Sequence, residues 1–309
     1  MLPDPAHDAV LCAVLCMSDD VGESNARLTQ LAFVVDPESR SGRHCVPGGV
    51  ELHSLLDEAA LLRALVSAVR ALDPDVLLGF DVHAGSVGYL AERGAVLGGE
   101  HSEMLRALSR TPGHTPPGAL RDDAYGRDHG AGIWVTGRCV LNFWRILRAE
   151  VKLGSYTYEA AMLAVLRRRV PALPRRVLAA WYAAPGARWR LVADVAGRAR
   201  GCALMAQQLD LVGRTAELAR VFGIEFNSVI TRGSQHRVEA MMLRLAHTQN
   251  FLALSPPPGN VTASEAPQCV ALVMEPESKL YTSPVVVLDF QSLYPSQVIA
   301  CVCRSRRAA

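Results

Sequence analysis

Residues 285–300 read VVVLDFQSLYPSQVIA, an apolar run that ends in an aspartate and continues into a polar, turn-rich string. We expect a buried β-strand over residues 284–290, because a short apolar run bounded by turn-forming residues favours one. Such a strand would hold Asp289 on rigid backbone, where its carboxylate can bind Mg²⁺. A lone aspartate at a strand end more often only caps the strand, with Tyr294 an ordinary half-buried aromatic.

The composition is typical of a globular protein. The 309 residues are 50% hydrophobic and 20% charged, which is enough for about two domains with buried cores. The formal net charge is only +2, so the overall charge does not require a polyanionic partner. Nucleic-acid binding must therefore be argued from local groups of basic residues.

The eight cysteines are scattered, without a C-x-x-C pair or a following histidine cluster, so a zinc or iron–sulfur site is not expected in this chain. No apolar run approaches the roughly 18 residues that suggest a membrane span, and no basic stretch precedes an apolar one near Met1. We expect free thiols, a reducing intracellular compartment and no membrane partner.

The first third of the chain predicts alternating strands and helices. Apolar runs at 9–17, 31–35 and 76–80 predict buried strands. Helical spacing after Ser54 predicts a helix that this serine caps, with acidic residues near its positive end and Asp73-Pro74 as its stop. This order indicates an α/β layer fold.

Further along, a helix is expected at 86–93, and the Gly- and Pro-rich residues 97–130 predict a long surface loop. Ser155 is a candidate helix cap, and residues 194–220 predict one long amphipathic helix with a kink at Gly213. The Pro- and Ser-rich residues 255–268 predict a linker, followed by a strand at 269–274.

The string DFQSLYPS at 289–296 resembles, residue for residue, motif A of family B DNA polymerases, which reads D-x-x-S-L-Y-P-S. The blocks 137–159, 208–226, 230–246 and 266–296 resemble the translesion, or zeta, branch of that family. The resemblance implies template-directed DNA synthesis, in which a dNTP is joined to a primer 3′-OH.

The resemblance also implies a role for each residue of the motif. Asp289 resembles the first catalytic, metal-binding carboxylate, and the carbonyl of Phe290 resembles a second ligand of the nucleotide-side metal. Ser292, Leu293 and Tyr294 would line the triphosphate. The ring of Tyr294 resembles the steric gate, which leaves no room beneath the sugar for a 2′-hydroxyl.

Family B polymerases usually carry a proofreading exonuclease before the palm, with four carboxylates that bind two metals. The block GFDVHAGSVGYL at 79–90 resembles its second motif, with Ser86 at the aspartate position. The third motif, Tyr-x-x-x-Asp, aligns with Asp194 and Arg198. Asp36-Pro37-Glu38 is interpreted as a surface turn, because its proline does not suit a strand. We therefore expect an exonuclease-like fold that has lost its catalytic carboxylates.

The resemblance implies an α/β fold in three parts. Residues 1–205 would form a ribonuclease H-like domain, which is an inactivated 3′-5′ exonuclease-like domain. Residues 206–254 would form a helical connection, and residues 255–309 would begin the polymerase palm with motif A.

Basic residues offer possible DNA contacts. Arginine fills residues 167–169, and Arg232, Arg237 and Arg244 recur beside His236 in a block predicted to be helical. Phosphate contact by Arg232 and Arg237 is possible. A solvated helix face is the plainer interpretation of such isolated arginines.

The family resemblance implies Mg²⁺ as cofactor, with an iron–sulfur cluster only in a carboxyl-terminal region that this chain does not contain. It also implies primer–template DNA, dNTP and the accessory subunits of the zeta complex as partners, and the nucleus as location. We expect a fragment of a longer protein, because the fingers motif K-x-x-x-N-S-x-Y-G and the carboxylate motif Y-G-D-T-D-S are missing. The alternative is a non-catalytic scaffold. An active ribonuclease H-like nuclease is disfavoured by Ser86 and Arg198.

Overall fold

The computed structural model describes residues 3–18, 28–38, 49–111, 130–252, 257–263 and 274–305. The chain divides into two compact units, residues 1–253 and 254–309. Within the described ranges, every helix is too short or too polar to cross a lipid bilayer.

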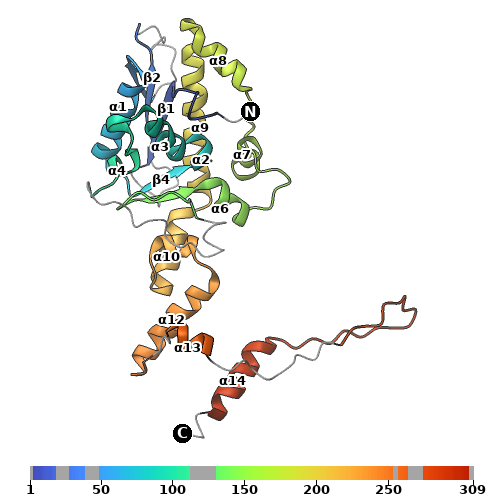
Figure 1. Ribbon diagram of the computed structural model, residues 1–309. Coiled ribbons are helices and arrows are strands. Elements are labelled where there is room, and N and C mark those ends of the chain that lie inside the picture. The colour runs from blue at the N-terminus through green and yellow to red at the C-terminus, as the bar shows by residue number, and fades with distance from the viewer. Residues whose placement is uncertain are drawn as a thin grey trace. The chain divides into compact units, whose positions relative to one another are not determined.

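The first unit contains two small β-sheets (Figure 1). Their strands are β1 (Cys12–Ser18), β2 (Leu28–Val35), β3 (Val50–Leu55), β4 (Val76–Gly79) and β5 (Cys139–Asn142). β2 lies between β1, its antiparallel neighbour, and β3, its parallel neighbour, and β4 pairs with β5 in parallel. The strands expected at 9–17, 31–35 and 76–80 are confirmed with small shifts at their ends.

The other regular elements of the first unit are helices. They are α1 (Glu58–Leu72), α2 (Val82–Gly85), α3 (Val87–Leu97), α4 (Met104–Ala107), α6 (Phe143–Glu150), α7 (Tyr158–Leu166), α8 (Arg175–Ala183), α9 (Arg188–Gln208), α10 (Leu211–Phe222), α11 (Phe226–Thr231) and α12 (Ser234–Thr248). Two 3-10 turns, at Gly99–His101 and Pro185–Ala187, complete this set among the described residues.

The three-stranded sheet is covered on both faces, because successive side chains of a strand point to opposite sides. Phe33 of β2 packs with Leu61 and Leu62 of α1. Its neighbour Val34 points the other way and packs with Val192 of α9. Figure 1 shows α1 and α9 on opposite sides of the sheet. The mixed α/β class expected from the sequence is confirmed.

Helix α1 begins at Glu58, three residues after the start that a cap at Ser54 would give. Ser54 lies in β3, opposite Val34 of β2, so its backbone belongs to the sheet. The cap is Asp57, whose Oδ1 accepts a hydrogen bond of 2.7 Å from the backbone N–H of Ala60. The prediction that Ser54 caps α1 was therefore wrong, whereas the stop at Asp73, in a left-handed conformation with φ 43°, is confirmed.

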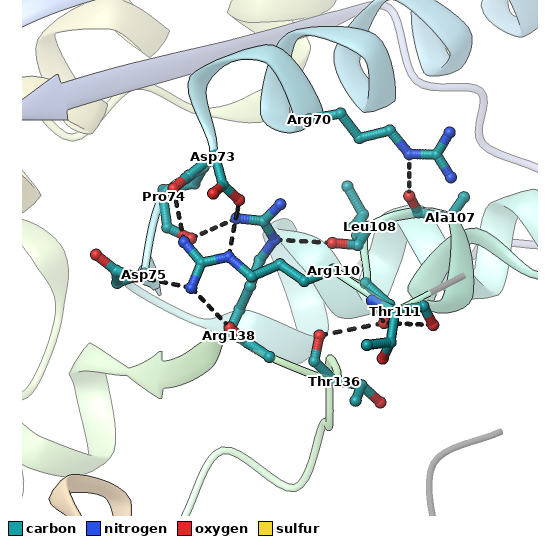
Figure 2. Close-up of polar contacts among 12 residues, drawn as sticks. Arg70, Asp73, Pro74, Asp75, Ala107, Leu108, Arg110, Thr111, Thr136 and Arg138 are labelled. Carbon is teal, nitrogen blue, oxygen red and sulfur yellow. Dashed lines mark hydrogen bonds and ion pairs between the residues drawn. The ribbon is translucent and has the colours of Figure 1, made fainter. Parts of the chain in front are cut away.

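One buried and one exposed arginine hold the turn after α1 in place (Figure 2). Arg138, at the start of β5, keeps 2% of its side chain exposed and lies 2.9 Å from Oδ1 of Asp73. Its Nε donates to the carbonyl of Leu108 at 2.8 Å. Arg110 reaches the same turn, with ion pairs of 2.8 Å to Asp73 and 2.7 Å to Asp75. Hydrogen bonding from Arg110 is the main reason that the pKa of Asp73 is lowered.

The loop expected at 97–130 is only partly described. Residues 112–129 lie outside the described ranges, but α4 and the preceding 3-10 turn are ordered, and Met104 and Leu108 are buried in the first core. A surface loop was therefore the wrong prediction for residues 99–108. Burial of these apolar side chains stabilises short helical turns there.

The helix expected at 194–220 is two helices. α9 ends at Gln208, and Asp210, in a left-handed conformation with φ 45°, separates it from α10. The kink was predicted at Gly213, which instead lies inside α10 against Asp210. A Cβ atom at this glycine would lie 2.3 Å from Oδ1 of Asp210. The cap expected at Ser155 is also displaced, because Thr157 caps α7.

The second unit contains α13 (Pro258–Ala263) and α14 (Leu293–Ser305). The linker predicted at 255–268 is helical at α13, and its remaining parts lie largely outside the described residues. The strand predicted at 284–290 is absent, and the side chains of residues 285–288 are exposed. A strand needs a hydrogen-bonded neighbour, and the described residues of this unit form none. The predicted strand at 269–274 is described only at Met274.

Candidate functional site

The motif at 289–296 lies at the start of α14. Asp289 and Phe290 precede the helix in a segment without regular structure, and Ser292 adopts a left-handed conformation with φ 54°. The carbonyl of Ser292 accepts a 3.0 Å hydrogen bond from the N–H of Ser296, so it closes the first turn of α14. Leu293 and Tyr294 are the first two residues of that helix.

The motif residues are accessible from solvent. The side chain of Tyr294 is 82% exposed, and that of Phe290 is 77% exposed. The N–H groups of the first turn of a helix have no partner inside the helix, and the helix dipole there favours anions. The start of α14 therefore has the physical properties that bind phosphate groups. The five site residues predicted from the motif lie within six consecutive positions of the chain, 289–294, so they are close together because they are near neighbours in sequence.

Motif A suits a hard cation only in part. The Asp289 carboxylate and the Phe290 carbonyl are oxygen donors of the kind that Mg²⁺ prefers. In the described part of the chain, however, no group of three or more His, Cys, Asp or Glu side chains is placed to hold a metal ion. Asp289 is thus a single carboxylate that needs a second one from elsewhere for a two-metal site.

Ser86, the first of the residues aligned with the exonuclease motifs, lies between α2 and α3. It is half-buried against the end of β4, where a Cβ atom on Gly79 would lie 2.5 Å from its Oγ. The nearby Asp81 caps α2, because its Oδ1 accepts hydrogen bonds from the backbone of His83 and Ala84. The Asp81 carboxylate therefore serves as the N-cap of α2.

Arg198 is held on α9 by two carboxylates. Its Nε donates to Oδ2 of Asp194 at 3.1 Å, and its Nη2 donates to Oε1 of Glu159 at 3.0 Å. Its guanidinium carbon lies 4.9 Å from the centre of the Tyr158 ring. We call Tyr158, Glu159, Asp194 and Arg198 the arginine cluster. It joins α7 to α9 with a positive charge at its centre.

The cluster is tightly packed, and its two carboxylates stabilise the charge of Arg198. Burial alone would lower the pKa of Arg198, but the charges and hydrogen bonds of Asp194 and Glu159 outweigh it and raise that pKa. The hydroxyl of Tyr158 donates to the carbonyl of Arg198 at 3.2 Å. A Cβ atom at Gly201 would lie 2.0 Å from this hydroxyl, so only glycine fits one turn further along α9.

The sequence did not reveal the part played by Tyr158 and Glu159. They lie 40 and 39 positions from Arg198, and no short-range pattern links them to it. The signal that could have found them is a basic residue in the motif position normally held by an acid, because a buried cation needs anions nearby.

The turn at Asp36 also differs from its prediction. Asp36 is 1% exposed, and its Oδ1 accepts a hydrogen bond of 2.6 Å from Nη1 of Arg188 on α9. Its backbone N–H donates to the carbonyl of Leu55 at the end of β3. The prediction of a surface turn was therefore wrong for Asp36. The cause is α9, which covers this end of the sheet and supplies the cation.

The arginines considered for DNA contact have structural partners. Arg237 of α12 donates to the carbonyl of Val229 at 2.6 Å, and Arg244 donates to the carbonyl of Val221 at 2.6 Å, so both dock α12 onto α10 and α11. Arg232 is exposed but caps the end of α11, so it does not lie on α12 as expected. Gly233 separates it from that helix.

Comparison with known proteins places the chain in a family. The model of the DNA polymerase family B exonuclease domain matches residues 2–160, and the model of DNA polymerase family B matches residues 224–303. The chain therefore belongs to DNA polymerase family B, with an exonuclease domain followed by the start of the polymerase domain.

Within that family, the chain is similar to catalytic subunits of DNA polymerase zeta. It is 45% identical to the DNA polymerase zeta catalytic subunit of Arabidopsis thaliana, 40% identical to that of Homo sapiens and 34% identical to that of Saccharomyces cerevisiae. Each comparison covers 96% of this chain but only 17%, 10% and 20% of the respective relative. The chain thus spans a fifth or less of the length of these relatives.

Proposed function

We propose that the chain is the exonuclease-like and early palm region of a translesion DNA polymerase, which joins a dNTP to a primer 3′-OH under the direction of a template. The observation that carries the proposal is the intact string DFQSLYPS, placed on an exposed turn and the first turn of α14. Similarity to zeta catalytic subunits over nearly the whole chain supports the translesion assignment.

In this proposal, Asp289 and the carbonyl of Phe290 would hold a Mg²⁺ ion, which would neutralise charge on the triphosphate. Ser292 and Leu293 present backbone N–H groups to the phosphates at the start of α14. Tyr294 packs beneath the deoxyribose and excludes a 2′-hydroxyl. Its large exposed side chain is consistent with a role in contacting substrate.

We further propose that the exonuclease-like domain does not proofread. Ser86 lacks the carboxylate of the second motif, and Arg198 places a cation where the third motif has an acid. The pairing of Arg198 with Asp194 and Glu159 supports this proposal, because both carboxylates already accept hydrogen bonds from its guanidinium. Hydrolysis by two metals requires free carboxylate ligands.

The proposal extends to the organisation of the protein. Residues 1–205 would be the exonuclease-like domain, 206–254 the helical connection and 255–309 the start of the palm. The division of the chain after residue 253 is compatible with the second boundary. Primer–template DNA, dNTP and the accessory subunits of polymerase zeta would be the partners, and the nucleus the location, because the similar proteins are eukaryotic zeta subunits.

A second candidate function is a non-catalytic scaffold. It is favoured by the exposed, unpaired residues 285–288 and by the single carboxylate of motif A. In that case the chain by itself would fold its first unit and make no DNA. The two functions are compatible, because a longer protein could supply the second carboxylate and the missing strands.

The experiment exchanges residues 1–309 into the Arabidopsis thaliana relative, in place of the segment that they match. Single-nucleotide incorporation of dNTP and rNTP is then measured for the exchanged enzyme and for its Asp289→Asn and Tyr294→Ala variants. We expect Asp289→Asn to lower dNTP incorporation by about three orders of magnitude or more, because a transition-state ligand is lost. Tyr294→Ala should instead raise the ratio of rNTP to dNTP use, because the wall that rejects the hydroxyl is gone.

The matched control is Tyr281→Ala, which removes another exposed tyrosine of the second unit but lies outside the motif. It should leave both rates unchanged. Near-normal turnover of Asp289→Asn, or unchanged ribonucleotide selectivity of Tyr294→Ala, would contradict the motif A assignment.

A further inference from the structure

The stretch from the first turn of α7 to the beginning of α9 carries a charge unlike that of the rest of the chain. Residues 160–193 contain seven arginines and no aspartate, glutamate or lysine, so their formal charge is +7, whereas the whole chain carries +2. The other residues therefore sum to −5. Five of the seven arginines fall within ten residues, 167–176, which we call the arginine platform.

The platform is exposed and largely without carboxylate partners. All five of its arginines are exposed to solvent. Arg167, Arg168, Arg169 and Arg176 make no ion pair with any carboxylate that the structure describes. Their four positive charges are therefore uncompensated. Arg138, Arg188 and Arg198, by contrast, each form an ion pair with a carboxylate.

The platform is also fixed in place. Arg167 ends α7 in a left-handed conformation, with its backbone N–H bonded to the carbonyl of Met162. Val170 packs against the core formed by α6, α7 and α9, and Pro174 is the N-cap residue of α8. The platform comprises the short connection between α7 and α8, which Figure 1 shows, and the first two residues of α8. The arginines therefore project from an anchored segment and not from a loose tail.

The beginning of α8 favours the binding of an anion. Arg176 lies in its first turn, where the helix dipole is positive and a cation is destabilising. Within the described residues, no side chain caps this helix. A bound phosphate would pair with the arginines and accept from the helix N–H groups at the same time.

We propose that the arginine platform binds the phosphate backbone of DNA, without regard to base sequence. Arginine is suited to phosphate because its planar guanidinium can donate two hydrogen bonds at once. A partner protein would be expected to use apolar contacts as well, but Val170 and Leu173 are half-buried and the exposed surface is almost entirely arginine and proline. The choice of DNA among polyanions rests on the proposed polymerase function, while the site is distinct from motif A.

The test measures the binding of the 309-residue chain to a fluorescently labelled primer–template duplex as a function of salt concentration. The platform variant R167Q/R168Q/R169Q is compared with the control R63Q/R106Q/R220Q. Both lower the formal net charge from +2 to −1. The three control arginines are exposed and paired with glutamates, so they are not part of an uncompensated group.

Each phosphate contact contributes about 0.9 to the slope of log affinity against log salt concentration. The platform variant should therefore lose about 2 to 3 from this slope, and about tenfold or more of its affinity at 50 mM salt. The control should keep the slope of the wild type. A variant with three lysines, R167K/R168K/R169K, should keep most of the slope, which separates loss of charge from loss of folding.

Equal slopes for the platform variant and the control would overturn the proposal. The proposal would also be overturned if polyglutamate competed with the labelled duplex as well as unlabelled DNA of equal charge does. The surface would then suit an acidic protein partner. The binding assay contains neither Mg²⁺ nor dNTP, so its salt slope does not depend on the motif A residues. Failure of the motif A assignment would therefore leave this binding intact, and the two failures can be told apart.

Discussion

Replacing Arg198 by methionine tests whether the arginine cluster holds α7 to α9. The substitution keeps a similar side-chain length but removes the charge, two ion pairs and the stacking on Tyr158. Asp194 and Glu159 would then face each other's charge without the cation between them. Their side chains are 13% and 25% exposed, so water can replace only part of the lost interaction with Arg198.

The expected cost follows from this intermediate burial. Exposed ion pairs contribute about 0.2–1 kcal/mol, whereas breaking a fully buried pair costs about 3–5 kcal/mol. The cation–π contact adds about 0.5–1 kcal/mol. The side chain of Arg198 is 33% exposed, so we expect a loss of about 2 kcal/mol, which corresponds to a decrease in Tm of about 4–8 °C for a unit of this size.

The assay is urea denaturation followed by circular dichroism, with Arg220→Met as matched control. Arg220 forms an ion pair with Glu217 in which both side chains are at least 67% exposed, so its loss should cost less than about 0.5 kcal/mol. Adding Asp194→Asn to the Arg198→Met variant should recover part of the lost stability, because it removes one uncompensated charge. Equal stabilities of Arg198→Met and the control, or no recovery by Asp194→Asn, would refute the reasoning.

Three further predictions concern the first unit. The purified chain should release no nucleotide from the 3′ end of a labelled primer in Mg²⁺; persistent release that Asp194→Ala abolishes would contradict this. Arg138→Met should lower the free energy of unfolding by about 2–4 kcal/mol in urea titrations, because buried carbonyls lose their donor; a loss below 1 kcal/mol would be unexpected. Burial raises the pKa of Cys12 and of Cys202 to about 12 and that of Cys16 to about 11, so all three stay protonated at pH 8. Iodoacetamide labelling with peptide mapping should find them unmodified in the native chain and modified in urea.

The sequence predicted those elements of the fold that depend on local patterns. β2 and β4 were found because apolar runs are bounded by turn formers, and the end of α1 was found because Asp73 precedes a proline. β3 was missed because its residues, VELHSL, alternate weakly and run directly into an amphipathic helix. Only pairing with β2 decides that Ser54 is a strand residue and not a cap.

Long-range contacts explain the remaining errors. Asp36 is followed by a proline and looked like a surface turn, but Arg188, 152 residues later, pairs with it and allows its burial. The apolar residues 285–288 have the pattern of a strand, but no neighbouring strand is present among the described residues of the second unit. For the candidate site, the motif string alone carries the roles of Asp289 and Tyr294, and these roles stay predictions.

The arginine cluster suggests why an exonuclease-like domain could keep its fold after losing its chemistry. In our proposal, Arg198 occupies the position of an acidic metal ligand. A bound metal ion balances the carboxylates around it and also offers open positions to water and phosphate oxygens. A guanidinium stabilises the same carboxylates, Asp194 and Glu159, through donated hydrogen bonds, but it has no acceptor and no open coordination position. The substitution therefore retains the electrostatic support for packing α7 against α9 and removes the means of activating water. In the same proposal, the replacement of the second motif's aspartate by Ser86 then costs little stability, because no metal ion remains for that carboxylate to bind.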